Sequence, residues 1–85
     1  MVLSLEDPID KLGLSRKYRN AIGRKKIRTI GELVNADIDV IDSMYYVGMI
    51  GILDIYNTLI KHGFSPAWSP NMSRKASGYL GEIDI

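Results

Sequence analysis

Residues 47–63 have the sequence Val-Gly-Met-Ile-Gly-Ile-Leu-Asp-Ile-Tyr-Asn-Thr-Leu-Ile-Lys-His-Gly, a glycine corner that opens directly into a helical pattern. The spacing predicts a helix from near Gly48 to Lys61 or His62, ended by a left-handed Gly63. Its apolar arc holds Met49, Ile52, Leu53, Ile55, Tyr56, Leu59 and Ile60, and its polar side holds Gly51, Asp54, Asn57, Thr58 and Lys61. Ile50 falls on the polar side, so we expect it to be exposed and treat it as a candidate contact.

A turn and a basic helix are predicted earlier in the sequence. Gly13 closes a turn that contains Pro8, and Ser15 is placed to cap a helix that runs to about Lys25 or Lys26. One side of this helix holds Leu14, Tyr18, Ala21 and Ile22, and the other holds Arg16, Lys17, Arg19, Asn20 and Arg24. The basic residues are therefore expected to share a face.

Two short helices are predicted between the basic helix and the glycine corner. Thr29 and Glu32 have capping-box spacing for a helix through Val34. Asp37 is placed to cap a third helix, from Ile38 to about Ser43. The pattern as a whole indicates an all-α fold of four short helices.

The end of the sequence differs in character from the helical part. The segment Ser65-Pro66-Ala67-Trp68-Ser69-Pro70 stops any helix, and Trp68 is expected to fold back because a free Trp would expose a large apolar surface. We predict a lead over residues 1–7, a helical domain over 8–70 and a flexible tail over 71–85. The end of that tail, 79–85, has enough strand propensity to add to a partner's sheet edge, although terminal disorder is the expected state.

Length and composition exclude several classes of protein. With 85 residues the chain forms one domain with a small core, and it has no Cys for disulfides or thiolate zinc ligands. There is no cationic, apolar leader and no run of about 18 apolar residues. His62 is the sole histidine, and no catalytic motif occurs. We therefore expect a cytoplasmic protein that is not an enzyme and has no metal, cofactor, small-molecule substrate or membrane partner.

The net charge of +1 conceals a separation of charges along the sequence. Eight of the eleven Lys and Arg residues lie between Lys11 and Arg28, without an acidic residue among them. From Glu32 to Asp54 every charged residue is acidic. A basic side of this kind attracts phosphate, although a solvated helix face explains the charge pattern equally well.

The glycine corner adds a second feature that suits phosphate. In the stretch from Met44 to Ile52, small residues would let phosphates approach the backbone amides at the start of a helix, where the dipole favours negative charge. Helix-hairpin-helix modules use this arrangement. Glycines also occur at helix corners for geometry alone, so the basic face in the same small domain is what favours a binding role.

A set of residues from position 8 to 65 resembles a known family. They are Pro8, Ile9, Asp10, Leu12, Leu14, Ser15, Asn20, Ile27, Ile30, Gly31, Glu32, Leu33, Val34, Val47, Gly48, Ile55, Leu59, Gly63 and Ser65. Without gaps, this pattern is similar to the C-terminal domain of the bacterial RNA polymerase alpha subunit, most specifically at 30–34. The resemblance implies a compact domain of four to five helices in a helix-hairpin-helix or SAM-like arrangement. It also implies binding to the minor groove of A/T-rich promoter DNA, contacts with transcription factors and, if DNA is bound, association with the nucleoid.

Residue by residue, the resemblance is mixed at the implied DNA site. Lys17 stands where the family has its principal minor-groove arginine, and a lysine lacks the planar fork of an arginine. Asn20 and Gly48 match the family. Ile50 and Gly51 replace a lysine and a serine, and Asp54 retains an acidic group at a partner-contacting position. One phosphate-binding charge and one hydroxyl donor are thus absent.

Two functions from different classes remain open on this sequence. The first is a DNA-binding transcription module whose contacts are Arg16, Lys17, Arg19, Asn20, Arg24, Gly48 and Gly51. The alternative is a protein-interaction adaptor or mimic with weak or lost DNA binding, which docks on RNA polymerase components or transcription regulators through Met49, Ile50, Asp54 and the tail. A duplex titration separates the two.

Overall fold

Four helices make up the part of the protein, residues 2–73, that the computed structural model describes. They are α1 (Arg16–Arg24), α2 (Ile30–Val34), α3 (Ile38–Asp42) and α4 (Met49–Lys61), with 3-10 turns at Ile9–Leu12 and Pro70–Met72. The described residues contain no β-strand longer than one isolated bridge. The predicted all-α fold is confirmed.

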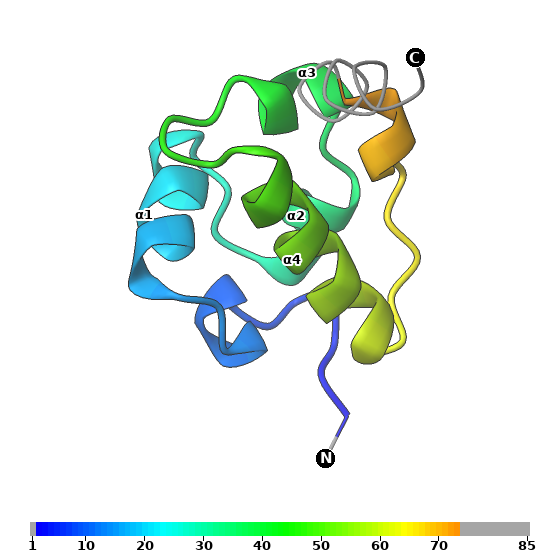
Figure 1. The fold of residues 1–85 in the computed structure, drawn as a ribbon. Helices are drawn as coiled ribbons and strands as arrows, with labels where there is room; N and C mark the ends of the chain where they lie inside the picture. Colours follow the sequence, from blue (N-terminus) through cyan, green and yellow to red (C-terminus); the bar gives the residue numbers. More distant parts are fainter. Residues whose placement is uncertain (1, 74–85) are drawn as a thin grey trace.

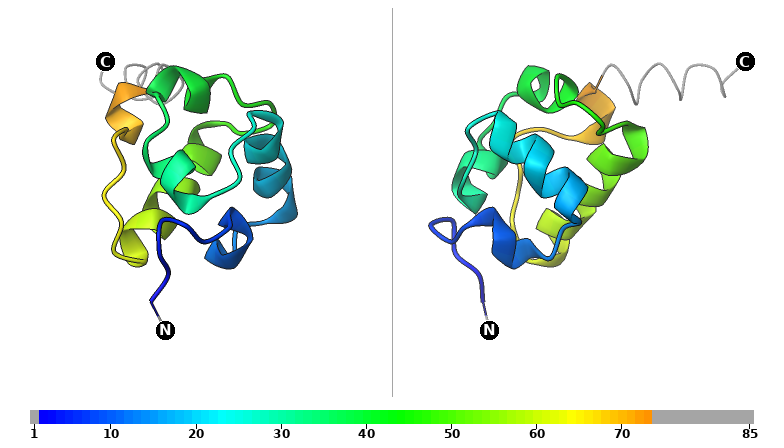
Figure 2. Two further views of the ribbon diagram at one scale, coloured as in Figure 1. Left: turned by 180° about the vertical axis from the view of Figure 1, so that it is seen from behind. Right: turned by 90° about the vertical axis from the view of Figure 1, so that its left-hand side faces the viewer.

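Helix α4 crosses the front of the fold in the view of Figure 1, with α1 to its left, α2 behind it and α3 above it, and the side view of Figure 2 shows it along one edge. Its inner face, with Ile52, Ile55 and Leu59, is fully buried. These side chains meet the buried residues of the other elements, chiefly Leu12, Leu14, Ile22, Ile30, Leu33, Ile41, Met44, Val47 and Trp68. Burial of this single apolar cluster is what stabilises so short a protein.

The start of α2 has the predicted capping box. The Glu32 amide donates to Thr29 Oγ1 at 3.1 Å, and the Thr29 amide donates to Glu32 Oε1 at 3.1 Å. The N-terminal lead is joined to the same place, because the Gly31 amide donates to the Leu5 carbonyl at 2.8 Å and the Ile30 amide to the Asp7 carbonyl at 2.9 Å. Helix α2 is thereby fixed by its own side chains and by the N-terminal segment.

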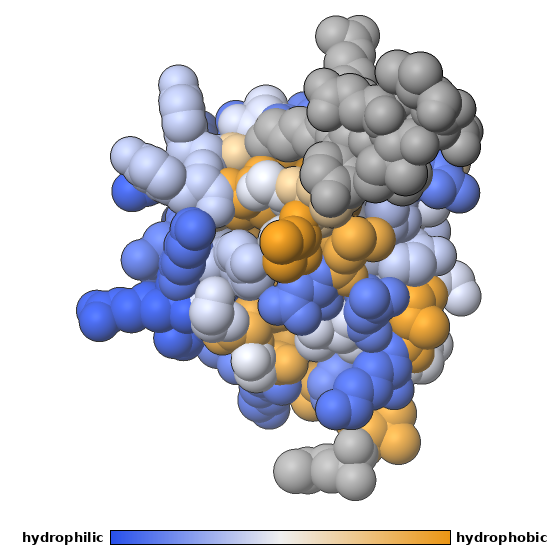
Figure 3. Space-filling view, viewed as in Figure 1, coloured by the Kyte–Doolittle hydropathy of each residue, from blue (hydrophilic) through white to orange (hydrophobic). Residues whose placement is uncertain are grey.

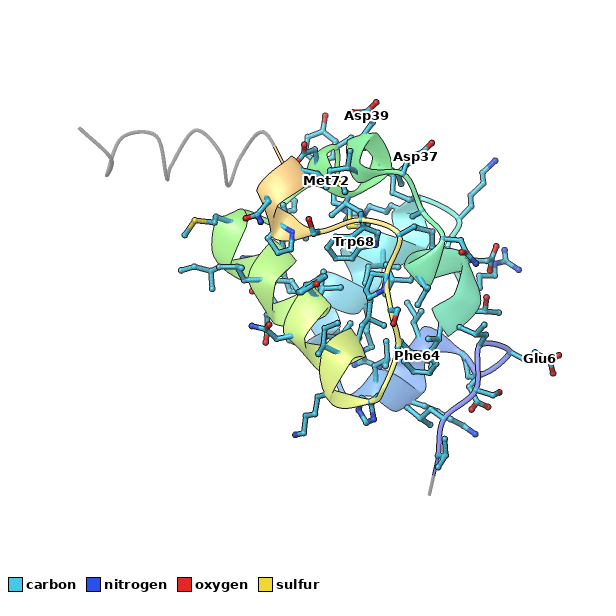
Figure 4. All side chains as sticks on the ribbon, turned by 90° about the vertical axis from the view of Figure 1, so that its right-hand side faces the viewer. Glu6, Asp37, Asp39, Phe64, Trp68 and Met72 are labelled. Carbon is cyan, nitrogen blue, oxygen red and sulfur yellow. The ribbon has the colours of Figure 1, made fainter. Side chains whose placement is uncertain are left out.

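The other end of α2 is closed by the segment that returns after α4. Trp68 is 1% exposed, and its indole Nε1–H donates to the Leu33 carbonyl at 3.0 Å. The Ala67 amide donates to the Val34 carbonyl at 2.8 Å, so both carbonyls at this helix end have partners. Figure 4 shows Trp68 turned inward between the returning segment and the helices. The predicted return of Trp68 is confirmed.

Helix α1 ends earlier than the sequence predicts. It stops at Arg24, because Lys25 and Lys26 bond back to the Ile22 and Gly23 carbonyls in a tighter turn, and Lys26 takes a left-handed φ of 62°. Left-handed Gly13 and Gly63 are found where predicted, with φ of 77° and 87°.

Two residues that were expected to cap helices occupy the N-cap positions but do not form the capping hydrogen bond. Ser15 and Asp37 stand at the N-caps of α1 and α3, but neither side chain hydrogen-bonds the first turn of its helix. Helix α3 ends at Asp42, one residue before the predicted limit. Both helices are therefore held mainly by packing rather than by their caps.

The apolar arc predicted for α4 is wrong at three positions. Leu53 and Ile60, expected inside, are exposed, and Gly51, expected on the polar side, is buried. A side chain at Gly51 would collide with Tyr18 of α1 and with Val47, so this part of α4 faces another element and not solvent.

Beyond the predicted end of the domain at residue 70, a 3-10 turn leads on to Ser73. Ser73 is buried, and its hydroxyl donates to Asp42 Oδ1 of α3. The rest of the predicted tail, including 79–85, lies outside the described residues. The division of the sequence into three parts stays a prediction. No helix among residues 2–73 has the length and apolar character to cross a membrane.

Candidate nucleic-acid interface

An open groove of about 430 Å³ lies where the middle of α1 meets the start of α4. Its walls are Lys17 and Tyr18 from α1, Tyr46 from the preceding turn, and Gly48, Met49, Ile50 and Gly51 at the start of α4. The structure thus places Lys17 and the glycine corner at 48–51, two of the contacts expected from the sequence, in the same groove.

The first turn of α4 presents free backbone donors at this groove. Gly48 is the N-cap residue and has no side chain to cap the helix, and the first amide bonded to it is that of Ile52, at 3.0 Å. Within residues 2–73, the amides of Met49, Ile50 and Gly51 donate to no acceptor. An anion placed here would receive these donors at the positive end of a 13-residue helix.

The two glycines of the corner, Gly48 and Gly51, differ in how much space surrounds them. A Cβ on Gly51 would lie 2.8 Å from Val47 Cγ1 and 2.9 Å from Tyr18 Cε1, so packing requires a glycine there. A Cβ on Gly48 would meet nothing within 4 Å, and its φ of −86° suits any residue. The described fold therefore has room for a side chain at position 48, and the backbone there is open to approach from outside.

Helix α1 brings cationic side chains to the rim of the groove. Arg16, Lys17, Asn20 and Arg24 are all exposed. Lys17 and Asn20 are three residues apart, so they lie on the same side of the helix. None of the α1 cations forms an ion pair within residues 2–73, where the recorded ion pair is Lys11 with Asp7 at 3.5 Å. Their positive charge is therefore not neutralised within that part of the protein.

Arg19 does not belong to this group, so the expectation that the basic residues share one face is wrong for it. It lies about 200° around α1 from Lys17, at the spacing of an α-helix. There it lines a separate hollow of about 280 Å³ with Gly23 and Arg28, at the side of the turn Ile9–Leu12. Its Nε is buried without a hydrogen-bond partner in the described residues. Arg19 therefore does not line the groove that contains Gly48, and its predicted contact with DNA stays a prediction.

An apolar rim borders the groove. Tyr46 and Ile50, which line it, are each 73% exposed, and Met49 is half-buried. Figure 3 shows hydrophilic side chains projecting over α1 and apolar atoms exposed over the first part of α4. Ile50 is exposed as predicted. Asp54, one turn further along α4, is also exposed but does not line the groove.

The two tyrosines of the groove were not predicted from the sequence. Tyr46 has a left-handed φ of 63°, which is unfavourable for a bulky residue, and its ring nevertheless stands in the groove wall. The Tyr-Tyr doublet just before a glycine corner is the signal that could have indicated it. Tyr18 was assigned to the core side of α1, and no local pattern shows that its ring reaches Gly51.

No group of acidic, His or Cys side chains able to hold a metal ion occurs among residues 2–73. The groove is lined by one lysine, two tyrosines, aliphatic residues and glycines. Such a surface offers donors and a cation to a ligand that accepts hydrogen bonds and carries negative charge.

Comparison with known protein families gives a match over most of the helical part. The model of the family described as the C-terminal domain of the bacterial RNA polymerase alpha chain matches residues 3–61, well over half of the sequence, and takes in α1 to α4. Searches of curated proteins and of solved structures find no significant match. The matched family is one of non-catalytic domains that take part in transcription. This protein therefore belongs to the family of C-terminal domains of the bacterial RNA polymerase alpha subunit.

Proposed function

We propose that this protein is a DNA-binding transcription module that holds one strand of a duplex in the groove between α1 and α4. The observation that carries the proposal is the meeting of an exposed lysine, free helix amides and a glycine with open space around its Cβ position in one groove. Membership of the alpha C-terminal domain family supports a role in transcription and association with polymerase or DNA.

Each element of the groove has a distinct task in this proposal. The amides of Met49, Ile50 and Gly51 bind a phosphate, and Gly48 lets the backbone of the strand come close. Lys17 reaches into the minor groove beside that strand, and Asn20 donates to base acceptors on its floor. Arg16 and Arg24 neutralise flanking phosphates. A/T-rich sequence is favoured because a narrow minor groove has an enhanced negative potential.

Titration with a short A/T-rich duplex, followed by backbone NMR shifts, tests the proposal on the full 85-residue protein. The amides of residues 16–20 and 48–51 should shift at low salt, and those of α2 should not. Affinity should fall as salt rises, with a log–log slope of about −0.9 for each phosphate neutralised. An unchanged spectrum at low salt would remove DNA as the ligand.

Gly48→Ala tests the close approach of the strand. Because a methyl group at Gly48 meets open space, the variant should fold normally, yet bind the duplex about tenfold more weakly or worse by blocking the strand. Gly23→Ala is the matched control, since Gly23 also has open space around its Cβ position but lies in the other hollow. Equal binding by both variants would count against the proposed path of the strand.

Lys17→Ala tests the charge. It should weaken binding about tenfold and make the salt slope shallower by about one phosphate. Lys11→Ala removes a charge from the turn Ile9–Leu12, away from the groove, and should have a smaller effect.

A second candidate function rests on the apolar rim. Two large side chains of the groove lining, Tyr46 and Ile50, are each 73% exposed, which is unusual for a surface that binds only phosphate. In this alternative, Met49, Ile50 and Asp54 contact a polymerase component or regulator, and DNA binding is weak or lost. Association with polymerase together with indifference to a duplex at low salt would favour it.

A further inference from the structure

The ring of Tyr18 is fixed against the first turn of α4. A Cβ added to Gly51 would lie 2.9 Å from Tyr18 Cε1, closer than real Cβ atoms come, and 3.2 Å from Tyr18 Cζ, which is also a tight contact. The ring therefore fills the space that a side chain at position 51 would take. This contact holds α1 and α4 at the spacing that forms the groove.

The hydroxyl of Tyr18 is carried by this ring to the groove wall. Cζ, the atom that bears the hydroxyl, lies next to the backbone of Gly51, and Tyr18 is one of the residues that line the groove. Although the residue is half-buried, its hydroxyl forms no hydrogen bond within residues 2–73. Partly buried tyrosine hydroxyls usually have a partner, so this donor is available for one from outside.

The groups around the Tyr18 hydroxyl indicate what kind of ligand it would bind. Nearby stand the ammonium group of Lys17 and the free amides at the start of α4, and none of the residues that line the groove is acidic. A group that accepts several hydrogen bonds and carries negative charge fits this set of donors. A phosphate of the DNA backbone has both properties.

We propose that the Tyr18 hydroxyl donates a hydrogen bond to the DNA phosphate bound at the start of α4, with Gly51 required so that the ring can lie there. This inference rests on the proposed function and adds a contact that neither the basic face nor the glycine corner predicts. Tyr18 thus joins α1 and α4 into one phosphate site rather than serving the core alone.

Tyr18→Phe tests the hydroxyl without removing the ring. We expect this variant to bind a fluorescein-labelled A/T-rich duplex about tenfold more weakly in an anisotropy titration, as for a lost hydrogen bond to a charged group. The salt slope should stay unchanged because no charge is removed. Tyr45→Phe, which removes an exposed hydroxyl outside the groove, is the matched control and should bind like the wild type.

A pair of variants tests the place of the hydroxyl. Tyr18→Ala should weaken binding at least as much as Tyr18→Phe, because both variants lose the hydroxyl. Tighter binding by Tyr18→Ala than by Tyr18→Phe would put the donor elsewhere and overturn the inference. If wild type and Tyr18→Phe bind equally well, the inference fails while the proposed function stands. If the wild type does not bind the duplex, both fail.

Discussion

The backbone groups at the ends of helix α2 are hydrogen-bonded within the described part of the protein, whereas the first amides of α4 are not. At α2, the Asp7 and Leu5 carbonyls and the Thr29 hydroxyl accept from the first amides, and the returning segment at Ala67 and Trp68 donates to the last carbonyls. At α4, Gly48 offers no side-chain cap, and within residues 2–73 the first three amides have no acceptor beside an exposed groove. Free backbone groups are costly only where water cannot reach them, so the open end is tolerated at the surface.

The contrast separates stability from binding within a very small domain. The α2 side contains the buried Trp68, whose ring lies 5.7 Å from that of Tyr56, and its polar groups have internal partners. The α4 side exposes Tyr45, Tyr46 and Ile50 and leaves donors free. Substitutions on the first side should change the free energy of unfolding and leave binding intact, and those on the second should do the reverse.

The largest expected effect is that of Trp68→Ala. Removing a fully buried Trp leaves a cavity and deprives the Leu33 carbonyl of a donor, so the free energy of unfolding should fall by about 3–5 kcal/mol. Urea unfolding followed by circular dichroism measures this loss, because the variant has no Trp fluorescence. Tyr45→Ala, on the open side, should stay within about 0.5 kcal/mol of the wild type. Similar urea midpoints for the two variants would erase the contrast.

Ile50→Lys should have the next largest effect, and on binding rather than on folding. A lysine at the exposed position 50 places a charge beside the free amides, so duplex affinity should rise about tenfold and the salt slope should steepen by about 0.9. Ile60→Lys is the matched control, because Ile60 is an exposed isoleucine on the same helix but lies outside the groove. Equal gains from both would mean that only net charge matters.

Much of the fold was predictable because its signals are local. The Thr29–Glu32 capping box, the left-handed Gly13 and Gly63 and the long apolar stripe of α4 each depend on residues within a few positions of one another. The early end of α1 was not predictable, since Lys26 adopts a left-handed conformation that its side chain does not favour. The return of Trp68 was predicted from its apolar surface, but its hydrogen bond to Leu33 joins residues 35 positions apart.

The groove was predictable only in part, for the same reason. Lys17 and Gly48 were assigned to one site, and both line the groove. The wrong placements of Arg19 and Gly51 come from contacts between elements, which a helical wheel for one helix does not contain. Gly51 is buried by a residue 33 positions earlier in the sequence, and Arg19 faces the turn Ile9–Leu12 instead of solvent beside Lys17.

A smaller effect is expected from Tyr46→Gly. This variant tests whether the left-handed backbone at position 46, in the groove wall, is strained. Glycine adopts a φ of 63° without the steric cost of a Cβ, so stability should rise by about 0.5–1 kcal/mol. Duplex affinity should fall about threefold with the loss of the ring from the groove wall. Lys26→Gly, at the other left-handed non-glycine residue in the described part of the protein, should show a similar gain in stability. A loss of stability in both would show that neither position is strained.

The smallest effect is expected at the closed end of α2, where the Glu32 carboxylate titrates. Hydrogen bonds from the Arg28 and Thr29 amides lower the pKa of Glu32 below its ordinary value. A carboxyl whose pKa is lower in the folded than in the unfolded state stabilises the fold above the unfolded pKa, and this contribution disappears as the pH falls through the folded pKa. Urea midpoints should therefore fall as the pH drops below the ordinary glutamate pKa of about 4.3.

Glu32→Gln keeps an oxygen that can accept in the capping box but removes the charge, so the decline of the midpoint with falling pH should become less steep. It should not vanish, because hydrogen bonding from the Ser4 amide also lowers the pKa of Asp7. Glu6→Gln is the control, since Glu6 points away from the body of the fold (Figure 4) and forms no hydrogen bond within residues 2–73. Duplex binding at neutral pH should be the same for both variants and the wild type, because α2 lies outside the groove. A change in binding for Glu32→Gln alone would show that the closed and open ends are coupled, against the separation that their geometry indicates.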